Sequence, residues 1–291
     1  MKEIRAIFKE INGFFLASGV FTYTLGTVLA VQAGQAWNTT TYFLGLLIFF
    51  GFYLLERTYA YLSRSKINVF STLQRSRRLR SPELVFFLFF LFAALLLCVY
   101  FISLSGGLRS PNWVWFLLLA VGILMNVSKN LNQWSMPYRW MTDGIIISPV
   151  LLFWGASLAK LDSTPILFFL SLPLLFFYLA SQTSLQFETY AEDLKKGQQA
   201  LLVSIGWEHG MTLHHVLVAL GYLGLGFYLY ISGAWVIAWP VLLMMSVSLF
   251  EIWQLQRIAG GMRPNWGLLK ATAITQYLGI LYILLFAFLA H

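Results

Sequence analysis

Long apolar runs constrain the fold of this chain more than any other feature. About 20 apolar residues suffice to carry a helix across the hydrocarbon core of a bilayer, which is about 30 Å thick. Only 10% of the 291 residues are charged, against about 25% in an ordinary soluble domain. We therefore predict an all-α, polytopic membrane protein, a single transmembrane domain over residues 1–291 with residues 1–13 as an interfacial segment. Nine transmembrane helices around a central cavity are expected at approximately 14–33, 40–62, 83–104, 112–128, 142–160, 165–187, 211–231, 235–255 and 268–290.

The distribution of charge predicts the orientation of these spans. Of the 19 Lys and Arg residues, all except Arg109 and Lys160 lie before the first span or near the ends of spans two, four, six and eight. Because basic loops stay in the cytoplasm, we expect the N-terminus inside and the C-terminus outside, in a bacterial-type plasma membrane. The acids follow the same division with Asp162 as the exception, which indicates a polar function and a cavity open toward the cytoplasm. The net charge of +8 thus reflects topology, and we expect the bilayer, not a nucleic acid, as partner.

Polar residues form a stripe at the end of span six. Gln182, Gln186, Thr189 and Asp193 are spaced by four, three and four residues, which places them on one helix face. A polar face is costly in lipid, so it lines a cavity or forms hydrogen bonds between helices; both interpretations remain open. Glu188 lies beside this stripe and, with Glu192 and Asp193, is either a cation site or part of a solvated segment with local ion pairs.

The other even-numbered spans also end in polar residues. Span two carries Glu56 and Arg64 on one face, and the basic segment after it, with Arg77, is suited either to a diphosphate or anionic lipid or to setting topology alone. Span four carries Asn126 and Asn130, and span eight ends with Glu251, Gln254 and Arg257. His214 and His215 begin span seven, and we interpret them as interfacial histidines. Together the stripes predict a polar pocket walled by the even-numbered helices.

Three segments resemble motifs of the UbiA superfamily of intramembrane prenyltransferases. The first is Asp193-Leu-Lys195-Lys-Gly197, followed nine residues later by Gly206, which is similar to the second aspartate motif of the family. The second is Trp134-Ser-Met-Pro137-Tyr-Arg139, which resembles the segment after the fourth span of the family. The third is the basic stretch Arg75-Ser-Arg77-Arg78-Leu79. The number of spans and the chain length agree with the family, so the resemblance covers nearly the whole chain.

The resemblance implies a magnesium-dependent transfer of a prenyl group from a prenyl diphosphate to a lipophilic acceptor, either aromatic or a quinone precursor. It makes Asp193, with Glu56 or Glu188 assisting, the catalytic carboxylates, and Asp193 with Glu188 the Mg²⁺ ligands. The residues expected to contact the substrate are Arg64, Arg77, Lys195, Arg139, Asn126, Asn130, Gln186 and Thr189.

The sequence departs from the family pattern at its carboxylates. The first aspartate motif has no counterpart, because our best register places Ala60, Arg64 and Asn68 at its acidic and amide positions. In the second motif Thr189 replaces the first aspartate. The alternative function is therefore a catalytically degenerate protein that binds an isoprenoid or quinone or serves as a membrane assembly subunit. A transporter, suggested by Pro149 and Pro240 inside spans, is a weaker interpretation.

Overall fold

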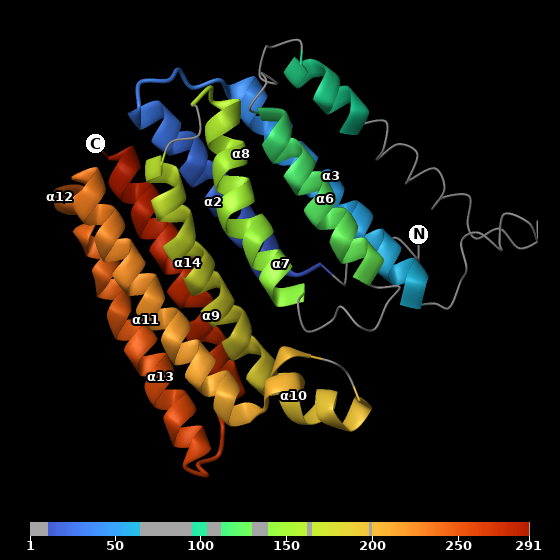
Figure 1. Cartoon of the computed structure of the whole chain (residues 1–291), viewed down its shortest axis with the longest axis vertical. Coiled ribbons are helices and arrows are strands. Elements are labelled where there is room, and N and C mark those ends of the chain that lie inside the picture. The colour runs from blue at the N-terminus through green and yellow to red at the C-terminus, as the bar shows by residue number, and fades with distance from the viewer. Residues whose placement is uncertain are drawn as a thin grey trace, which may run out of the picture.

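The computed structural model describes residues 11–64, 95–103, 112–129, 139–161, 165–197 and 200–290, and within them the side chains of all but 59–64, 123–129 and 237. The described residues form helices and connecting turns without a β-strand, as Figure 1 shows. The α-helices are α2 (Gly13–Gln32), α3 (Thr39–Arg64), α6 (Asn112–Lys129), α7 (Arg139–Ile145), α8 (Leu151–Leu158), α9 (Pro165–Lys196), α10 (Leu201–Ile205), α11 (Trp207–Ser232), α12 (Trp235–Ala238), α13 (Met245–Ala259) and α14 (Trp266–Leu289).

Within the described residues, seven helical segments are long and apolar enough to cross a membrane. They coincide with the predicted spans one, two and five to nine, usually within a few residues at each end, so the all-α membrane architecture is confirmed. Residues 95–103 are helical within the predicted third span, and α6 covers the predicted fourth, although its apolar part is only Trp113–Gly122. Nine spans and their orientation therefore stay predictions, and residues 1–10 of the expected interfacial segment lie outside the described part of the chain.

Two prolines interrupt the regular helix geometry inside the spans. Pro149 lies in a π-helical turn, Ile146–Val150, which joins α7 to α8. Pro240 lies near the start of a 3₁₀ segment, Trp239–Met244, which leads into α13. A proline ring removes one backbone donor and collides with the preceding turn, so each site departs locally from α-helical geometry. The two interruptions differ in kind and do not form a matched pair of broken helices.

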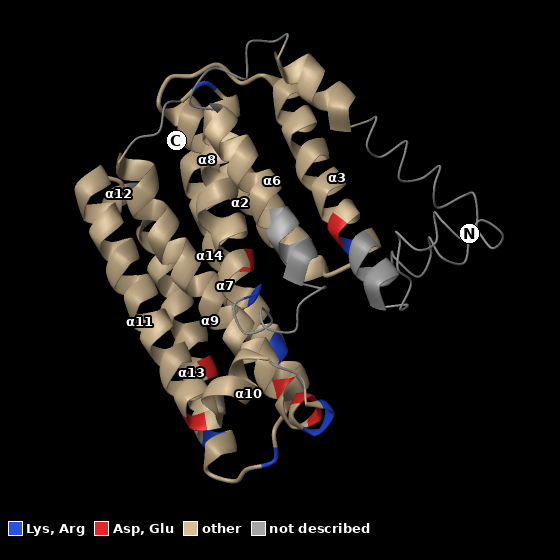
Figure 2. Ribbon diagram, turned by 45° about the vertical axis from the view of Figure 1, so that its right-hand side comes forward, with Lys and Arg blue, Asp and Glu red and all other residues tan. Residues whose placement is uncertain are grey.

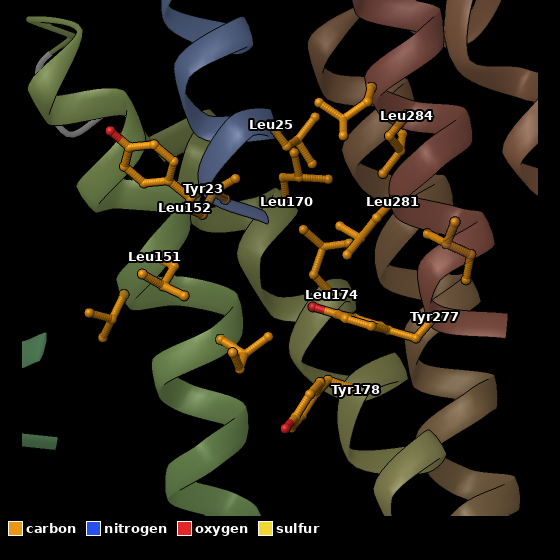
Figure 3. Packing of buried hydrophobic residues seen from close by; sticks show 14 of the residues in the cluster. Tyr23, Leu25, Leu151, Leu152, Leu170, Leu174, Tyr178, Tyr277, Leu281 and Leu284 are labelled. Carbon is orange, nitrogen blue, oxygen red and sulfur yellow. The ribbon is translucent and has the colours of Figure 1, made fainter. Parts of the chain in front are cut away.

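The core of the bundle forms where α2, α8, α9 and α14 meet. Figure 3 shows leucine and tyrosine side chains from these helices interdigitating, among them Leu25, Leu152, Leu174 and Leu281, and each of these leucines is fully buried. Lipid is as apolar as leucine, so close van der Waals packing, not exclusion of water, holds such helices together within a bilayer.

Glycines allow α2 and α8 to approach each other closely. A Cβ atom at Gly26 would lie 2.0 Å from the backbone carbonyl oxygen of Leu152, and one at Gly155 would lie 2.1 Å from that of Tyr23. Thr27 also donates a hydrogen bond from its hydroxyl to the Gly155 carbonyl over 3.3 Å. Since the obstacle is backbone in both cases, no side-chain rearrangement makes room for a larger residue. This contact fixes α8 against α2 and positions the preceding helix, α7.

Candidate functional site

Charged residues gather at one end of the bundle. Figure 2 shows this for the described lysines, arginines and acids, and Lys160 lies at the opposite end. We call this end, where α3, α9 and α13 end and α7, α11 and α14 begin, the charged end. Helix α9 has 32 residues and is therefore about 48 Å long, which exceeds the roughly 30 Å of a hydrocarbon core. Its last turns, with Asp193, therefore extend beyond the depth of the apolar core.

A cluster of three charged side chains joins α3 to α7. The Arg139 Nη2 atom lies 3.1 Å from Glu56 Oε1, and Arg139 Nε lies 3.8 Å from Asp143 Oδ2. The Glu56 side chain is 2% exposed, whereas those of Arg139 and Asp143 are 25% and 16% exposed. Asp143 follows Arg139 by one helical turn, so both lie on the same side of α7, and Arg139 interacts with both carboxylates. We call Glu56, Arg139 and Asp143 the Glu56 cluster.

Tyr53 of α3 and Tyr178 of α9 lie close to the Glu56 cluster. The guanidinium carbon of Arg57 lies 4.9 Å from the centroid of the Tyr53 ring, and the Tyr53 hydroxyl accepts a hydrogen bond from the Asn12 backbone N–H over 2.7 Å. On α9, Gln182 donates to the Tyr178 hydroxyl over 3.1 Å. Asp143 lies close enough to Tyr178 to interact with it electrostatically. Polar groups of α3, α7 and α9 therefore lie close together around the Glu56 cluster.

The predicted polar stripe on α9 exists as a helical face. The helix continues to Lys196, and Thr189 donates from its hydroxyl to Asp193 Oδ2 over 2.8 Å, the contact expected four residues apart. Gln186 and Asp193 are half-buried, and the buried Gln186 Oε1 atom has no hydrogen-bond partner within the described part of the chain. Glu188 points elsewhere, toward Lys270 of α14 at 3.5 Å. The two expected Mg²⁺ ligands, Asp193 and Glu188, therefore face different neighbours.

The structure separates Asp193 from the Glu56 cluster by depth. Asp143 interacts with Tyr178, and Asp193 lies 15 residues further along α9, about 22 Å along the helix axis. Arg139 and Glu56 lie about one turn nearer the charged end than Asp143. Most of the roughly 22 Å in depth therefore still separates them from Asp193. Since Mg²⁺ binds its ligands at about 2.0–2.1 Å, Asp193 and Glu56 cannot hold the same ion in this arrangement.

The described residues contain no group of three or more His, Cys, Asp or Glu side chains placed to share a metal ion. Mg²⁺ is often held by only one or two carboxylates, with substrate phosphates completing its shell. The half-buried Asp193 at the projecting end of α9 fits such a site, in which a diphosphate supplies the remaining oxygens. Lys195, exposed two residues later, lies on the same final turns.

The two motif glycines have a backbone role. Gly197 ends α9 with φ at 63°, and Gly206 joins α10 to α11 with φ at 84°. Both values lie in the region that favours glycine. The backbone conformation at these two turns is sufficient to explain both glycines. Their presence is therefore no evidence for the chemistry of the neighbouring Asp193.

For four of the predicted substrate-binding residues, the structure does not describe the side chain. Arg77 and Asn130 lie outside the described residues. Arg64 and Asn126 belong to α3 and α6, but their side chains are not described. Of the remaining predicted residues, Thr189 bonds Gln186 and Asp193 within α9, and Glu56 and Arg139 form the contact between two helices.

Two features of the structure were missed by sequence reasoning. Asp143 joins the Glu56 cluster, although nothing in its neighbourhood marks it apart from the i, i+4 spacing from Arg139. His214, interpreted as interfacial, is instead fully buried, and its Nε2 atom lies 3.3 Å from Oε1 of the equally buried Glu251. An acid within an apolar span was the available signal for this pair.

Comparison with known proteins does not assign the chain to a family. No protein-family model matches the sequence, and no curated protein matches it significantly.

Proposed function

We propose that this chain is a UbiA-like membrane prenyltransferase, which moves a prenyl group from a prenyl diphosphate to a lipophilic aromatic or quinone-precursor acceptor. The observation that supports this most is the contact between Arg139 and Glu56. These residues are 83 positions apart, and both were selected from the sequence as parts of one substrate site. Their contact places a partly exposed guanidinium at the junction of α3, α7 and α9.

The chemistry requires positive charge around a leaving diphosphate. The bond between the allylic C1 atom and the diphosphate oxygen breaks, and its electron pair leaves with the diphosphate. An aromatic carbon of the acceptor then forms a bond to C1, and the ring loses a proton to water. In this proposal Lys195, two residues from Asp193, binds diphosphate oxygens and stabilises the charge that develops on them. Arg139, which lies far from Asp193 in depth and contacts Glu56, binds an oxygen of the acceptor.

Asp193 is the residue that we expect to hold Mg²⁺, which when bound adds positive charge beside the diphosphate. Glu188 would assist only by giving up its contact with Lys270. Glu56 has a different role in this proposal, because it holds the Arg139 side chain in place instead of binding the ion with Asp193.

The alternative, a degenerate protein that binds an isoprenoid or quinone or acts as an assembly subunit, also has a supporting observation. Glu56 is already paired with Arg139, and Asp193 receives a hydrogen bond from Thr189 where the family motif would supply a second carboxylate. Such an arrangement favours binding over turnover.

Binding and transfer assays on the purified full chain in detergent distinguish the two functions. Farnesyl and geranylgeranyl diphosphates would be tested for binding across a magnesium titration, and then for transfer to a panel of aromatic acceptors. We expect Asp193→Asn to lower turnover on the order of a thousandfold, because several kcal/mol of charge stabilisation are lost. Arg139→Gln, combined with Glu56→Gln so that no buried carboxylate loses its partner, should raise the KM for the acceptor about tenfold and leave donor binding unchanged.

The matched control is Arg257→Gln, which removes an exposed arginine at the same end of the bundle and should leave both readouts unchanged. Magnesium-linked donor binding without any product would support the alternative. Absence of donor binding, or an Asp193→Asn variant as active as the wild type, would refute the transferase proposal.

A further inference from the structure

A groove runs between α11 and α13, away from the Glu56 cluster. It has a volume of about 410 Å³. Its apolar walls are Val218, Ala219 and Leu223 of α11 and Met245, Leu249 and Ile252 of α13. The α13 positions are four and three residues apart, and on α11 Leu223 follows the adjacent pair Val218 and Ala219 by about one turn, so each helix contributes one continuous stripe. We call this feature the α11–α13 groove.

Three polar residues interrupt the apolar walls. The Tyr222 hydroxyl lies 2.8 Å from the Ser248 hydroxyl, a hydrogen bond that connects the two helices across the groove. His215 also lines the groove, and its Nε2 atom is buried without a hydrogen-bond partner among the described residues. A buried polar atom without a partner is costly, so an oxygen-bearing ligand that bonded the imidazole would be favoured.

A buried ionisable pair lies directly behind the groove. His214 and Glu251 are both fully buried and 3.3 Å apart, yet their nitrogen and oxygen atoms are not aligned as a hydrogen bond within the described part of the chain. Glu251 lies close enough to His215 and Tyr222 to interact electrostatically with both. Ionisable groups buried within membrane spans are rare and usually functional. The groove therefore has a polar base that apolar helix packing does not require.

The surroundings of the groove restrict what can occupy it. Leu223 is 71% exposed and Leu249 is 55% exposed, so at the depth of a membrane span the groove opens toward lipid. Its occupant must therefore dissolve in the bilayer. The lining contains no Lys or Arg, and the carboxyl group of Glu251 lies behind it, which disfavours an anionic head such as a phosphate. A volume of about 410 Å³ falls in the usual range for small-molecule sites, about 300–1,000 Å³.

We infer that the α11–α13 groove binds a neutral, lipid-soluble ring that carries a carbonyl or hydroxyl oxygen, the chemistry of a quinone or phenol. The ring oxygen bonds the Tyr222–Ser248 hydroxyl pair, or His215 after a rotation of the imidazole that exposes its Nε2 atom to the groove, and the apolar tail extends past Leu223 into the bilayer. This site is independent of the proposed prenyl transfer, which uses α3, α7 and α9. Failure of either proposal leaves the other standing.

Equilibrium dialysis of the purified full chain tests this site with decylubiquinone as the probe. Decylbenzene carries the same tail and a ring without oxygens, and decyl phosphate carries an anionic head. Ala219→Phe fills the groove from an exposed position, so it should fold normally. Val216→Phe is its matched control, because Val216 is 48% exposed on α11 and does not line the groove. His215→Leu removes the imidazole, and Tyr222→Phe removes only a hydroxyl. The thermal unfolding midpoint of each variant reports on its fold.

We expect saturable binding of decylubiquinone, weakened about tenfold or more by Ala219→Phe and unchanged by Val216→Phe. His215→Leu should weaken decylubiquinone binding up to about tenfold without affecting decylbenzene, because one hydrogen bond is lost. If His215→Leu does not fold, Tyr222→Phe should show the same selectivity. Equal affinity for decylbenzene, or tighter binding of decyl phosphate, would identify a site for ordinary lipid and overturn the inference. So would an Ala219→Phe variant that binds decylubiquinone like the wild type.

Discussion

The buried pair of His214 and Glu251 should contribute a measurable coupling energy to stability. A protonated His214 and an ionised Glu251 at 3.3 Å would interact by about 5 kcal/mol at an effective dielectric constant of about 20, so the coupling energy tests whether the pair is charged. Removing one partner of a buried ion pair typically costs about 3–5 kcal/mol, whereas replacing both by apolar residues is often neutral or stabilising. Hydrogen-bonded pairs in membrane proteins couple by only about 0.6 kcal/mol on average, and by about 1.7 at most. We therefore expect a double-mutant cycle of His214→Leu and Glu251→Leu to give a coupling above about 2 kcal/mol.

The assay is reversible unfolding of the purified protein in mixed micelles with increasing sodium dodecyl sulfate, followed by tryptophan fluorescence. The free energy of unfolding is extrapolated for the wild type, both single variants and the double variant. The same cycle on Tyr222→Phe and Ser248→Ala is the control, since these residues form an uncharged hydrogen bond between the same two helices. The double leucine variant should be close to the wild type in stability. A coupling for His214 and Glu251 no larger than that of the control would show that the two groups do not form an ion pair.

Three further predictions follow from the packing and the charge distribution. Gly26→Ala should destabilise the protein by about 1–3 kcal/mol, because its Cβ would collide with backbone, while Gly226→Ala, with open space around it, should be neutral or slightly stabilising; equal midpoints in the same unfolding assay would contradict the close approach of α2 and α8. Lys270→Ala breaks an exposed ion pair and should change stability by less than about 1 kcal/mol, so a larger loss would show that the contact is shielded from solvent. In a variant lacking the native cysteine, single cysteines at Ser76 and Gly233 should react with an impermeant thiol reagent in intact cells only at position 233, and the reverse pattern would invert the predicted orientation.

The spans were predictable because the signal for a membrane helix is local. A run of about 20 apolar residues identifies a segment whatever its neighbours are. Predicted spans such as 14–33, 165–187 and 268–290 accordingly match α2, α9 and α14 at or near both ends, except where α9 continues to Lys196 through polar residues. Helical spacing likewise placed Thr189 and Asp193 on one face, and their hydrogen bond confirms it.

The candidate site was only partly predictable, because its geometry depends on which helices pack together. Spacing along α9 could not show that Glu188 would face Lys270 of α14 while Asp193 stayed with Thr189. Nor could it show that Asp193 lies far from the Glu56 cluster in depth. A family-like motif indicates which residues belong to a site, and the separation between helices decides whether they reach one another.

The amino-acid sequence by itself determined that this chain is a helical membrane protein with its charges concentrated at one end, because hydrophobicity and helical periodicity are properties of neighbouring residues. Only the tertiary structure decided the partners of its buried acids. Glu56 and Glu251 have similar sequence contexts, because each is a single acid near the end of an apolar span. In the structure one meets Arg139 and the other His214, each on a different helix. The physical reason is that an acid buried within a membrane needs a nearby polar partner, and that partner comes from whichever helix packs against it.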